Sequence, residues 1–122
     1  MAIRRKTDAG IRKSPTRIPG LDNMTGGGLP ARAVTLVVGA AGAGKTILAL
    51  QTLAGAARDG EPGIFVAFEE PAKRIVANAA SFGWGLPGLM RRRMLMIDAR
   101  LPQEAAQSGN FEITGLLASV AA

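Results

Sequence analysis

The residues with the clearest chemical capability lie in the segment Gly39-Ala-Ala-Gly-Ala-Gly-Lys45-Thr46, which matches the pattern G-x-x-x-x-G-K-[ST]. Glycines allow a backbone to fold around a phosphate chain, so that successive N–H groups point at the phosphate oxygens. A helix-forming run follows from Thr46 onward, and the start of a helix adds unpaired N–H groups and the positive end of its dipole. The segment therefore predicts a binding site for a nucleoside triphosphate.

Two side chains of this loop have separate expected roles. We expect the Lys45 ammonium to reach the β- and γ-phosphates, and the Thr46 hydroxyl to ligate Mg²⁺. The residues expected to contact the nucleotide form one continuous run: Ala41, Gly42, Ala43, Gly44, Lys45, Thr46 and Ile47.

A pair of carboxylates, Glu69 and Glu70, follows the apolar run 63–68. In open α/β sheets ligands bind at the carboxyl ends of the strands, and triphosphate hydrolysis needs a group that orients or deprotonates the attacking water. Adjacent strand residues point in opposite directions, so we expect one glutamate to face the site and the other to face the flank or solvent. The alternative is a pair of solvated acids that open the helix after Pro71, where the helix dipole favours negative charge.

Three further groups carry weaker signals. Asp98 ends the apolar run 94–98, which is the form of a Walker B element that holds Mg²⁺, but many buried strands end at an aspartate that caps a turn. The run Arg91-Arg92-Arg93 is suited to contact phosphate or a neighbouring subunit, although such a run is more often a solvated helix end. Phe82 and Trp84 are able to stack on a base, and core packing is the role that we favour for both.

The elements that must position these residues alternate between strands and helices. Apolar runs without alternation predict strands buried on both faces over 34–38 and 63–68, and a third strand candidate covers 94–98. Helices are expected over 46–58, 72–82, 86–92 and 112–121, with a polar loop over 103–110. This alternation predicts βαβ units and a mainly parallel sheet, that is, an α/β fold.

The composition limits the classes of protein to consider. A chain of 122 residues holds at most one domain, and an apolar share of 48% is sufficient for a globular core. Cysteine and histidine are absent, which excludes disulfides and cysteine-ligated metal sites and leaves carboxylates, Lys45 and a bound cation for any catalysis. The apolar segments are too short for a membrane span and no secretion signal is visible, so we expect a cytoplasmic protein without a membrane partner.

The formal net charge of +6 is concentrated at the start of the chain. Residues 1–17 hold six basic side chains against Asp8 alone, and we interpret them as a flexible basic leader before a folded region at 18–122. A mobile basic leader is able to bind phosphate backbones non-specifically, but no aromatic side chain is interleaved to stack on bases. A nucleic-acid partner is therefore an alternative that we do not favour.

Several separate segments together resemble the KaiC group of RecA-like ATPases. The resemblance runs from about residue 18 to the C-terminus, and its most specific parts are Phe68-Glu-Glu70 and Ser81-Phe-Gly-Trp84. The other matching segments are Gly20-Leu-Asp22, Gly27-Gly-Leu-Pro30, the loop Gly39–Thr46 and Ile97-Asp-Ala99. The resemblance implies a RecA-like P-loop NTPase fold, with a mostly parallel sheet and flanking helices.

The resemblance also implies a function. Such a protein is an ATPase that uses ATP and Mg²⁺ and assembles as a homo-oligomer, a hexameric ring with ATP between its subunits. The family's pair of catalytic glutamates falls on Glu69 and Glu70, and Ser81 lies in a segment that borders the nucleotide. The resemblance argues against a metal role for Asp98, because the family's Walker B strand comes later in the chain.

The sequence stops before that Walker B strand and before the late basic residues that reach a neighbouring subunit's phosphates. We therefore expect the N-terminal half of one KaiC domain, from a truncated gene product or a longer chain, with weak or no hydrolysis of its own.

Two alternative functions stay open. One is a RecA/RadA-type DNA repair ATPase, which shares the Gly-Leu-Asp and Gly-Gly-Leu opening and would make use of the basic leader. The other is a non-catalytic half-domain that docks on full-length homologues through an exposed sheet edge.

Overall fold

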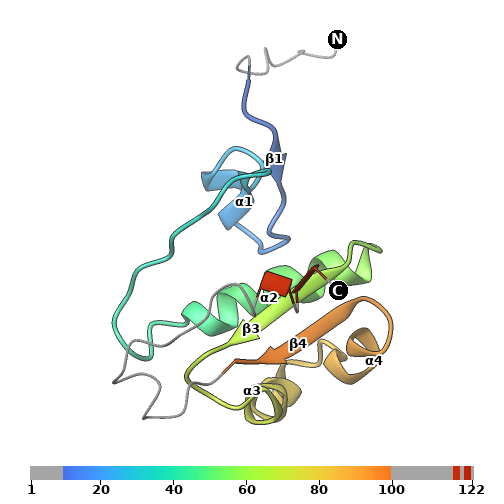
Figure 1. Cartoon of the computed structure of the whole chain (residues 1–122). Helices are drawn as coiled ribbons and strands as arrows, with labels where there is room; N and C mark the ends of the chain where they lie inside the picture. Colours follow the sequence, from blue (N-terminus) through green and yellow to red (C-terminus); the bar gives the residue numbers. More distant parts are fainter. Residues whose placement is uncertain (1–9, 100–116, 119, 122) are drawn as a thin grey trace.

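The computed structural model describes residues 10–99, 117, 118, 120 and 121. Figure 1 shows the arrangement of the elements in this part of the chain. The strands are β1 (Lys13–Ser14), β2 (Leu29–Pro30), β3 (Gly63–Ala67) and β4 (Met94–Asp98). The helices are α1 (Leu21–Met24), α2 (Lys45–Arg58), α3 (Ala72–Ala79) and α4 (Leu86–Met90), with a 3-10 turn, η1 (Ala80–Phe82), directly after α3.

The parallel pair β3–β4 forms the centre of the fold. The strands pair in register from Gly63 opposite Met94 to Ala67 opposite Asp98. Parallel strands need a crossover connection, and here the crossover contains α3, η1 and α4. Both strands are short apolar runs, and they confirm the strands expected at 63–68 and 94–98, with β3 ending one residue early.

Helices α2, α3 and α4 share one hydrophobic core with one face of this sheet. Phe65 and Met96 pack against the core, so alternate residues of both strands face the helices. Gly63 lets α2 approach β3 closely, because a Cβ at this position would lie 2.9 Å from the Leu53 side chain. The buried core residues are Leu50, Ala54, Ala57, Ala67, Ile75, Ala79, Leu86 and Met94.

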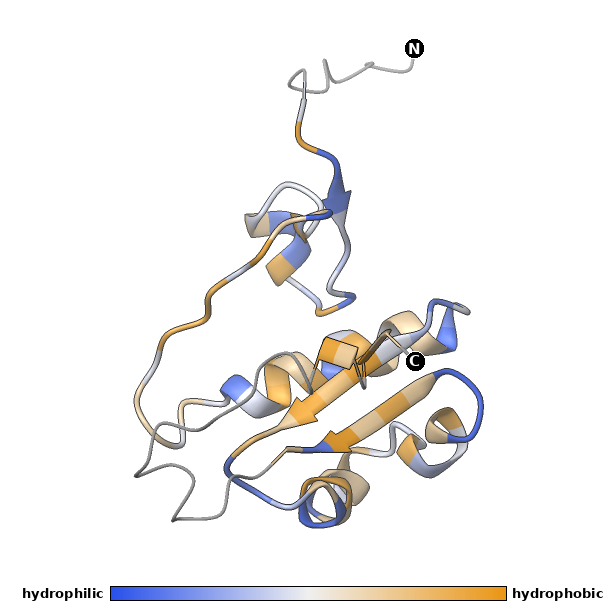
Figure 2. Cartoon of the chain, in the orientation of Figure 1, coloured by the Kyte–Doolittle hydropathy of each residue, from blue (hydrophilic) through white to orange (hydrophobic). Residues whose placement is uncertain are grey.

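The opposite face of the β3–β4 pair is also apolar. It carries Ile64, Val66, Leu95 and Ile97, which alternate with the core-facing residues and therefore point away from the core. Ile64 is 39% exposed and Leu95 is 50% exposed, so the described residues do not bury the strand at 63–68 on both faces as the sequence predicts. Figure 2 shows both strands as largely apolar along their length. Strands with apolar residues on both faces are typical of a sheet that is covered on both sides.

A small N-terminal unit consists of β1, α1 and β2, with β1 antiparallel to β2. Its centre is Thr16, which is 1% exposed and donates its hydroxyl to the Asp22 carboxylate at 2.5 Å. The same carboxylate accepts the N–H groups of Thr16 and Arg17 at 2.9 and 3.0 Å. These hydrogen bonds, that of the Thr16 hydroxyl first, lower the pKa of Asp22 because they stabilise its ionised form.

The expected leader overlaps this unit. Lys13 and Ser14 form β1, and Thr16 and Arg17 bond to Asp22, so these residues belong to the folded part and precede the expected start at Ile18. Residues 1–9 of the leader lie outside the described part of the chain.

Arg17 joins the N-terminal unit to the C-terminal end of α2. Its Nε forms a short ion pair with the Asp59 carboxylate, and its Nη2 lies 3.4 Å from Glu61 Oε1. The two acids raise the pKa of Arg17, and the hydrogen bond to Asp59 contributes most. Gly55 makes room for the arginine, because a Cβ there would lie 2.9 Å from the Arg17 side chain. We call Arg17, Asp59 and Glu61 the arginine clamp.

The prediction of a strand at 34–38 is wrong. The segment has no strand conformation, and Val34, Leu36 and Val38 are 98%, 84% and 83% exposed. It belongs to a long connection from β2 to α2 that runs apart from β3 and β4 in Figure 1. A strand is stable only when its backbone groups pair with a neighbour, and no segment among the described residues pairs with 34–38.

The helix expectations agree with the structure where it describes them. α2 covers the helix expected at 46–58, α3 and η1 together cover 72–82, and α4 covers most of 86–92. Leu117, Ala118, Val120 and Ala121 are helical, whereas the rest of the helix expected at 112–121 and the loop at 103–110 lie outside the described residues. None of the described helices is long and apolar enough to cross a membrane.

Candidate nucleotide-binding site

The glycine-rich loop before α2 uses backbone conformations that favour glycine. Gly42 and Gly44 have φ angles of +79° and +95°, in a region that costs other L-residues about 1–2 kcal/mol. The loop is also tight at its start, because a Cβ on Gly39 would lie 3.0 Å from the Ala43 Cβ. The Ala43 N–H donates to the Ala40 carbonyl at 3.1 Å, which closes a turn. These features explain why small residues occupy the positions between Gly39 and Lys45.

The N-terminus of α2 has no capping side chain, because the residue before the helix is a glycine. Gly44 is the residue that precedes the helix, and no side chain caps the helix here. The first intrahelical bond of this end runs from the Leu48 N–H to the Gly44 carbonyl at 2.9 Å. The N–H groups of Lys45, Thr46 and Ile47 therefore have no partner within the helix. Three such groups and the positive end of a 14-residue helix form a site suited to an anion.

The Lys45 side chain folds back over the loop. Its Nζ donates to the carbonyl oxygens of Gly39 and Ala40 at 2.6 and 2.9 Å. The ammonium therefore lies on the same loop as the open N–H groups, where a phosphate oxygen can replace a carbonyl as its acceptor. Thr46 is exposed at the first turn of the helix, so its hydroxyl is accessible to a ligand.

The two strand-end glutamates differ in their contacts. Glu70 Oε1 lies 3.3 Å from Arg74 Nε and accepts a hydrogen bond of 3.4 Å from Asn78 Nδ2, so it is held against α3. Glu69 is exposed and has no side-chain partner in the described part of the chain. In Figure 1 the carboxyl ends of β3 and β4 point toward the end of the molecule where α2 begins. Glu69 is thus the freer acid at the edge of the sheet nearest to the loop.

Ser81 and the two aromatic residues lie in a different region. Ser81 is exposed in η1, at the opposite end of α3 from Glu70, which is a separation of about 12 Å along the helix. The structure therefore does not bring Ser81 next to the strand-end acids. The rings of Phe82 and Trp84 stack with centroids 4.7 Å apart at 18°. Trp84 packs on the core, as expected, whereas Phe82 is 48% exposed.

Asp98 lies in β4, and the run Arg91-Arg92-Arg93 forms the turn before that strand. Asp98 is the last residue of β4 and pairs in register with Ala67. The Arg93 guanidinium donates to the Gly60 carbonyl at 2.8 Å and so ties the turn before β4 to the turn after α2. Arg91 and Arg92 are exposed. Among the described residues, no group of three aspartate, glutamate, histidine or cysteine side chains is placed to hold a metal ion.

Comparison with known proteins decides the family. Residues 14–121 match the model of the family described as "ATPase: KaiC". The chain belongs to the KaiC ATPase family. Its parallel strands with flanking helices are part of a RecA-like P-loop ATPase domain, which confirms the fold class expected from the sequence.

The KaiC relatives are considerably longer than this chain. The circadian clock oscillator protein KaiC of Prochlorococcus marinus subsp. pastoris is 46% identical over 110 residues, which are 88% of this chain and 22% of that protein. The circadian clock protein KaiC2 of Synechocystis sp. is 42% identical over 107 residues, which are 85% of this chain and 19% of that protein. KaiC of Thermostichus vulcanus is 42% identical over 115 residues, 92% and 22%. The chain therefore spans about a fifth of the length of these relatives.

The sequence does not reveal the contacts that hold the N-terminal unit of this KaiC-family chain together and join it to α2. The sequence pattern places Arg17 in the leader, and nothing in its neighbourhood indicates that it reaches Asp59 and Glu61, more than forty positions away. Asp22 has a weak signal, because an aspartate near the start of a helix commonly accepts backbone N–H groups, here those of Thr16 and Arg17.

Proposed function

We propose that this chain binds ATP through the loop from Ala41 to Ile47. The observation that carries the proposal is the open N-terminus of α2: the N–H groups of Lys45, Thr46 and Ile47 have neither an intrahelical partner nor a capping side chain. The Lys45 ammonium on the same loop adds the positive charge that a triphosphate requires. Membership of the KaiC ATPase family supports ATP as the nucleotide.

The residues at this site also fit Mg²⁺ bound together with ATP. The exposed Thr46 hydroxyl is a hard oxygen ligand at the first turn of α2, and Mg²⁺ takes few protein ligands beside phosphate oxygens and water. When bound, the ion neutralises charge on the β- and γ-phosphates. The role of this chain is to hold the phosphates with Lys45 and the loop N–H groups.

Hydrolysis, in this proposal, depends on Glu69 and Glu70 with unequal roles. Glu69 is exposed and unpaired with any described residue, so its carboxylate is free to accept a proton from the attacking water. Glu70 is held by Arg74 and Asn78, and so orients the end of β3 relative to α3. Ser81 remains a weaker candidate for contact with the nucleotide.

The proposed assembly follows from the family resemblance, and the proposed location follows from the sequence composition. We place the protein in the cytoplasm, as a homo-oligomer with ATP between subunits in a hexameric ring when the whole family domain is present. Phosphoryl transfer by this chain alone is expected to be weak, because cations supplied by a neighbouring subunit contribute several orders of magnitude in such enzymes.

Titration of the protein with ATP and Mg²⁺ by calorimetry tests the proposal. Lys45→Ala is expected to abolish detectable binding, a loss of at least about a hundredfold, because charge-assisted hydrogen bonds to phosphate disappear. Lys73→Ala removes the same charge from an exposed position on α3 and is expected to leave binding unchanged. Equal ATP affinity in the two variants would refute the site assignment.

The role of the glutamates is tested by replacing both. Glu69→Gln combined with Glu70→Gln should leave ATP affinity unchanged and remove phosphate release, with Glu69→Gln alone giving most of the loss, about 10²–10⁴-fold. Hydrolysis that survives both substitutions would place the catalytic carboxylate elsewhere.

A second candidate function is a half-domain that docks on full-length homologues. The exposed apolar side chains of Val34, Leu36 and Val38 and the apolar outer face of β3–β4 favour it, because such surfaces commonly mark interaction sites. Mixing the chain with a full-length KaiC-family protein and measuring co-assembly by sedimentation tests this function. Association without added ATP turnover would support it, and separate sedimentation of the two proteins would exclude it.

A further inference from the structure

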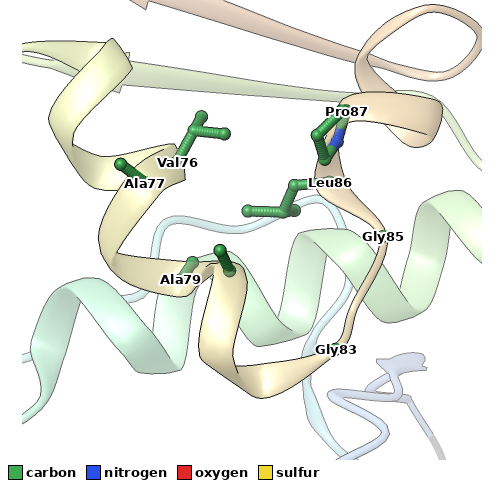
Figure 3. A pocket seen from close by; sticks show the side chains of 8 residues that line it. Val76, Ala77, Ala79, Gly83, Gly85, Leu86 and Pro87 are labelled. Atoms are coloured by element: carbon green, nitrogen blue, oxygen red, sulfur yellow. The ribbon is translucent and has the colours of Figure 1, made fainter.

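Two adjoining pockets lie on the surface formed by α3, η1 and α4. The first has a volume of about 490 Å³ and is apolar, with Val76, Ala79, Leu86 and Pro87 among its lining residues (Figure 3). The second has a volume of about 300 Å³ and is lined by Trp84, Gly85, Gly88, Leu89, Arg91 and Arg92. Gly85 lines both pockets, so the apolar surface continues into the basic one.

The second pocket has two arginine side chains that form no ion pair or hydrogen bond with any described residue. The side chains of Arg91 and Arg92 are exposed and have no partner among the described residues, whereas the neighbouring Arg93 is bound to the Gly60 carbonyl. Two unpaired guanidinium groups beside an apolar wall favour an anionic ligand that also has an apolar part.

One face of the Trp84 ring is occupied within the fold. Phe82 covers one face of the indole at 4.7 Å, and Trp84 is half-buried against the core. The edge of an aromatic ring carries positive partial charge, and the indole N–H is a donor that no described residue accepts. A carboxylate is suited to such an edge, whereas a nucleobase needs a free ring face for stacking.

The two glycines of the pocket leave the backbone accessible. A Cβ added to Gly85 or Gly88 would meet no atom within 4 Å, so open space lies above both positions. A peptide can therefore come close to the backbone of Gly85 and Gly88, because neither residue has a side chain in the way.

We propose that these two pockets form a docking site for an acidic peptide segment of a partner protein. In this arrangement an apolar side chain of the peptide occupies the pocket between α3 and α4, and its carboxylates pair with Arg91 and Arg92. Single-stranded nucleic acid is less well matched, because it requires a basic groove that follows several phosphates, and here two unpaired arginines serve a single small pocket.

The only tryptophan of the protein makes the test direct, because Trp84 lines the proposed site. The full chain is titrated with the peptide Glu-Asp-Leu-Glu-Asp-Leu-Glu while Trp84 fluorescence is recorded. A saturable change that weakens with added salt is expected. The matched peptide Gln-Asn-Leu-Gln-Asn-Leu-Gln is expected to bind at least about tenfold more weakly, because its amides replace the carboxylates.

Two variants separate the pocket from general charge attraction. Arg91→Ala with Arg92→Ala should weaken binding of the acidic peptide by about tenfold or more. Gly88→Leu keeps every charge and fills the pocket, and it should weaken binding to a similar degree. The control Arg12→Ala with Arg32→Ala removes two exposed charges that flank β1 and β2, and it should leave the affinity unchanged. Circular dichroism of each variant checks that the fold is kept.

Three results would overturn the proposal. One is equal binding of the acidic and neutral peptides. Another is a loss of binding as large in the Arg12/Arg32 control as in the Arg91/Arg92 variant. The third is an oligothymidine that binds more tightly than the acidic peptide and loses its affinity in Gly88→Leu, which would assign the pocket to nucleic acid. If Gly88→Leu does not fold, the affinities of the Arg91/Arg92 variant and the Arg12/Arg32 control are compared, and this comparison alone supports or rejects the proposal.

Discussion

The two ends of α2 are built in opposite ways. At the N-terminal end, Gly44 offers no capping side chain and the first N–H groups of the helix are left without intrahelical partners. At the C-terminal end, the Asp59 N–H donates to the carbonyls of Gly55 and Ala56, and the Asp59 carboxylate is held by Arg17. One end thus keeps its hydrogen-bonding capacity for a ligand, and the other uses it within the fold. Substitutions at the N-terminal end should therefore lower ligand affinity, whereas substitutions at the C-terminal end should leave it unchanged.

Between the two ends, Leu50 is completely buried and anchors α2 in the core. Leu50→Ala is expected to lower the free energy of unfolding by about 2–5 kcal/mol, because it removes buried methyl groups and leaves a cavity. Denaturant unfolding followed by circular dichroism measures the effect. Leu36→Ala removes the same side chain where it is 84% exposed, and should change stability little. A similar loss in both variants would contradict the packing described for α2.

Gly44→Ala tests the open end of the helix. The φ angle of +95° at this position makes a side chain unfavourable, so stability should fall by about 1–2 kcal/mol and the loop N–H groups should be displaced. ATP affinity should therefore fall with stability. Gly88→Ala is the matched control, because Gly88 lies in α4 without a positive φ and a Cβ there meets no atom within 4 Å. An unchanged ATP affinity in Gly44→Ala would show that the loop geometry is not needed for binding.

Asp22→Asn tests the N-terminal unit through its pH dependence. The pKa of Asp22 is lowered in the folded protein by the Thr16 hydroxyl and the backbone N–H groups, so the ionised form stabilises the fold. This stabilisation is complete above the unfolded pKa of about 3.9 and is lost as the pH falls through the lower folded value. The wild type should be more stable than Asp22→Asn at neutral pH, and the difference should shrink below about pH 4. A difference that stays constant from neutral to strongly acid pH would contradict this origin.

Arg17→Ala should have the smallest effect. Asp59 and Glu61 are each 61% exposed at the side chain, and exposed ion pairs contribute about 0.2–1 kcal/mol. We expect a loss of stability in this range, reduced further by salt, and no change in ATP affinity, because the arginine clamp lies at the far end of α2 from the loop. Arg58→Ala, at an exposed neighbouring position, serves as the control. A large decrease in ATP affinity in Arg17→Ala would show that the two ends of the helix are coupled.

The sequence predicted the local elements better than their partners. α2, β3 and β4 were found because a helix and two short apolar strands have strong local signals. The segment 34–38 has the same kind of apolar run as β3, yet it lies exposed without a strand partner among the described residues. A strand depends on a neighbour that composition does not specify, so this expectation failed for a physical reason.

The candidate site was predictable to a similar extent. The spacing of Gly39, Gly44 and Lys45 located the loop, because the positive φ angles and the helix start that it needs are local. The unequal contacts of Glu69 and Glu70 and the reach of Arg17 to Asp59 depend on how elements pack, and no single-sequence pattern encodes those distances.

A ¹H–¹⁵N correlation spectrum of the protein, recorded before and after addition of ATP and Mg²⁺, shows whether the open N-terminus of α2 binds the nucleotide. We expect the largest chemical-shift changes at the amides of Lys45, Thr46 and Ile47, because their unpaired N–H groups would donate to phosphate oxygens when ATP binds. Shifts confined to the basic residues of the leader, with these three amides unchanged, would contradict this expectation.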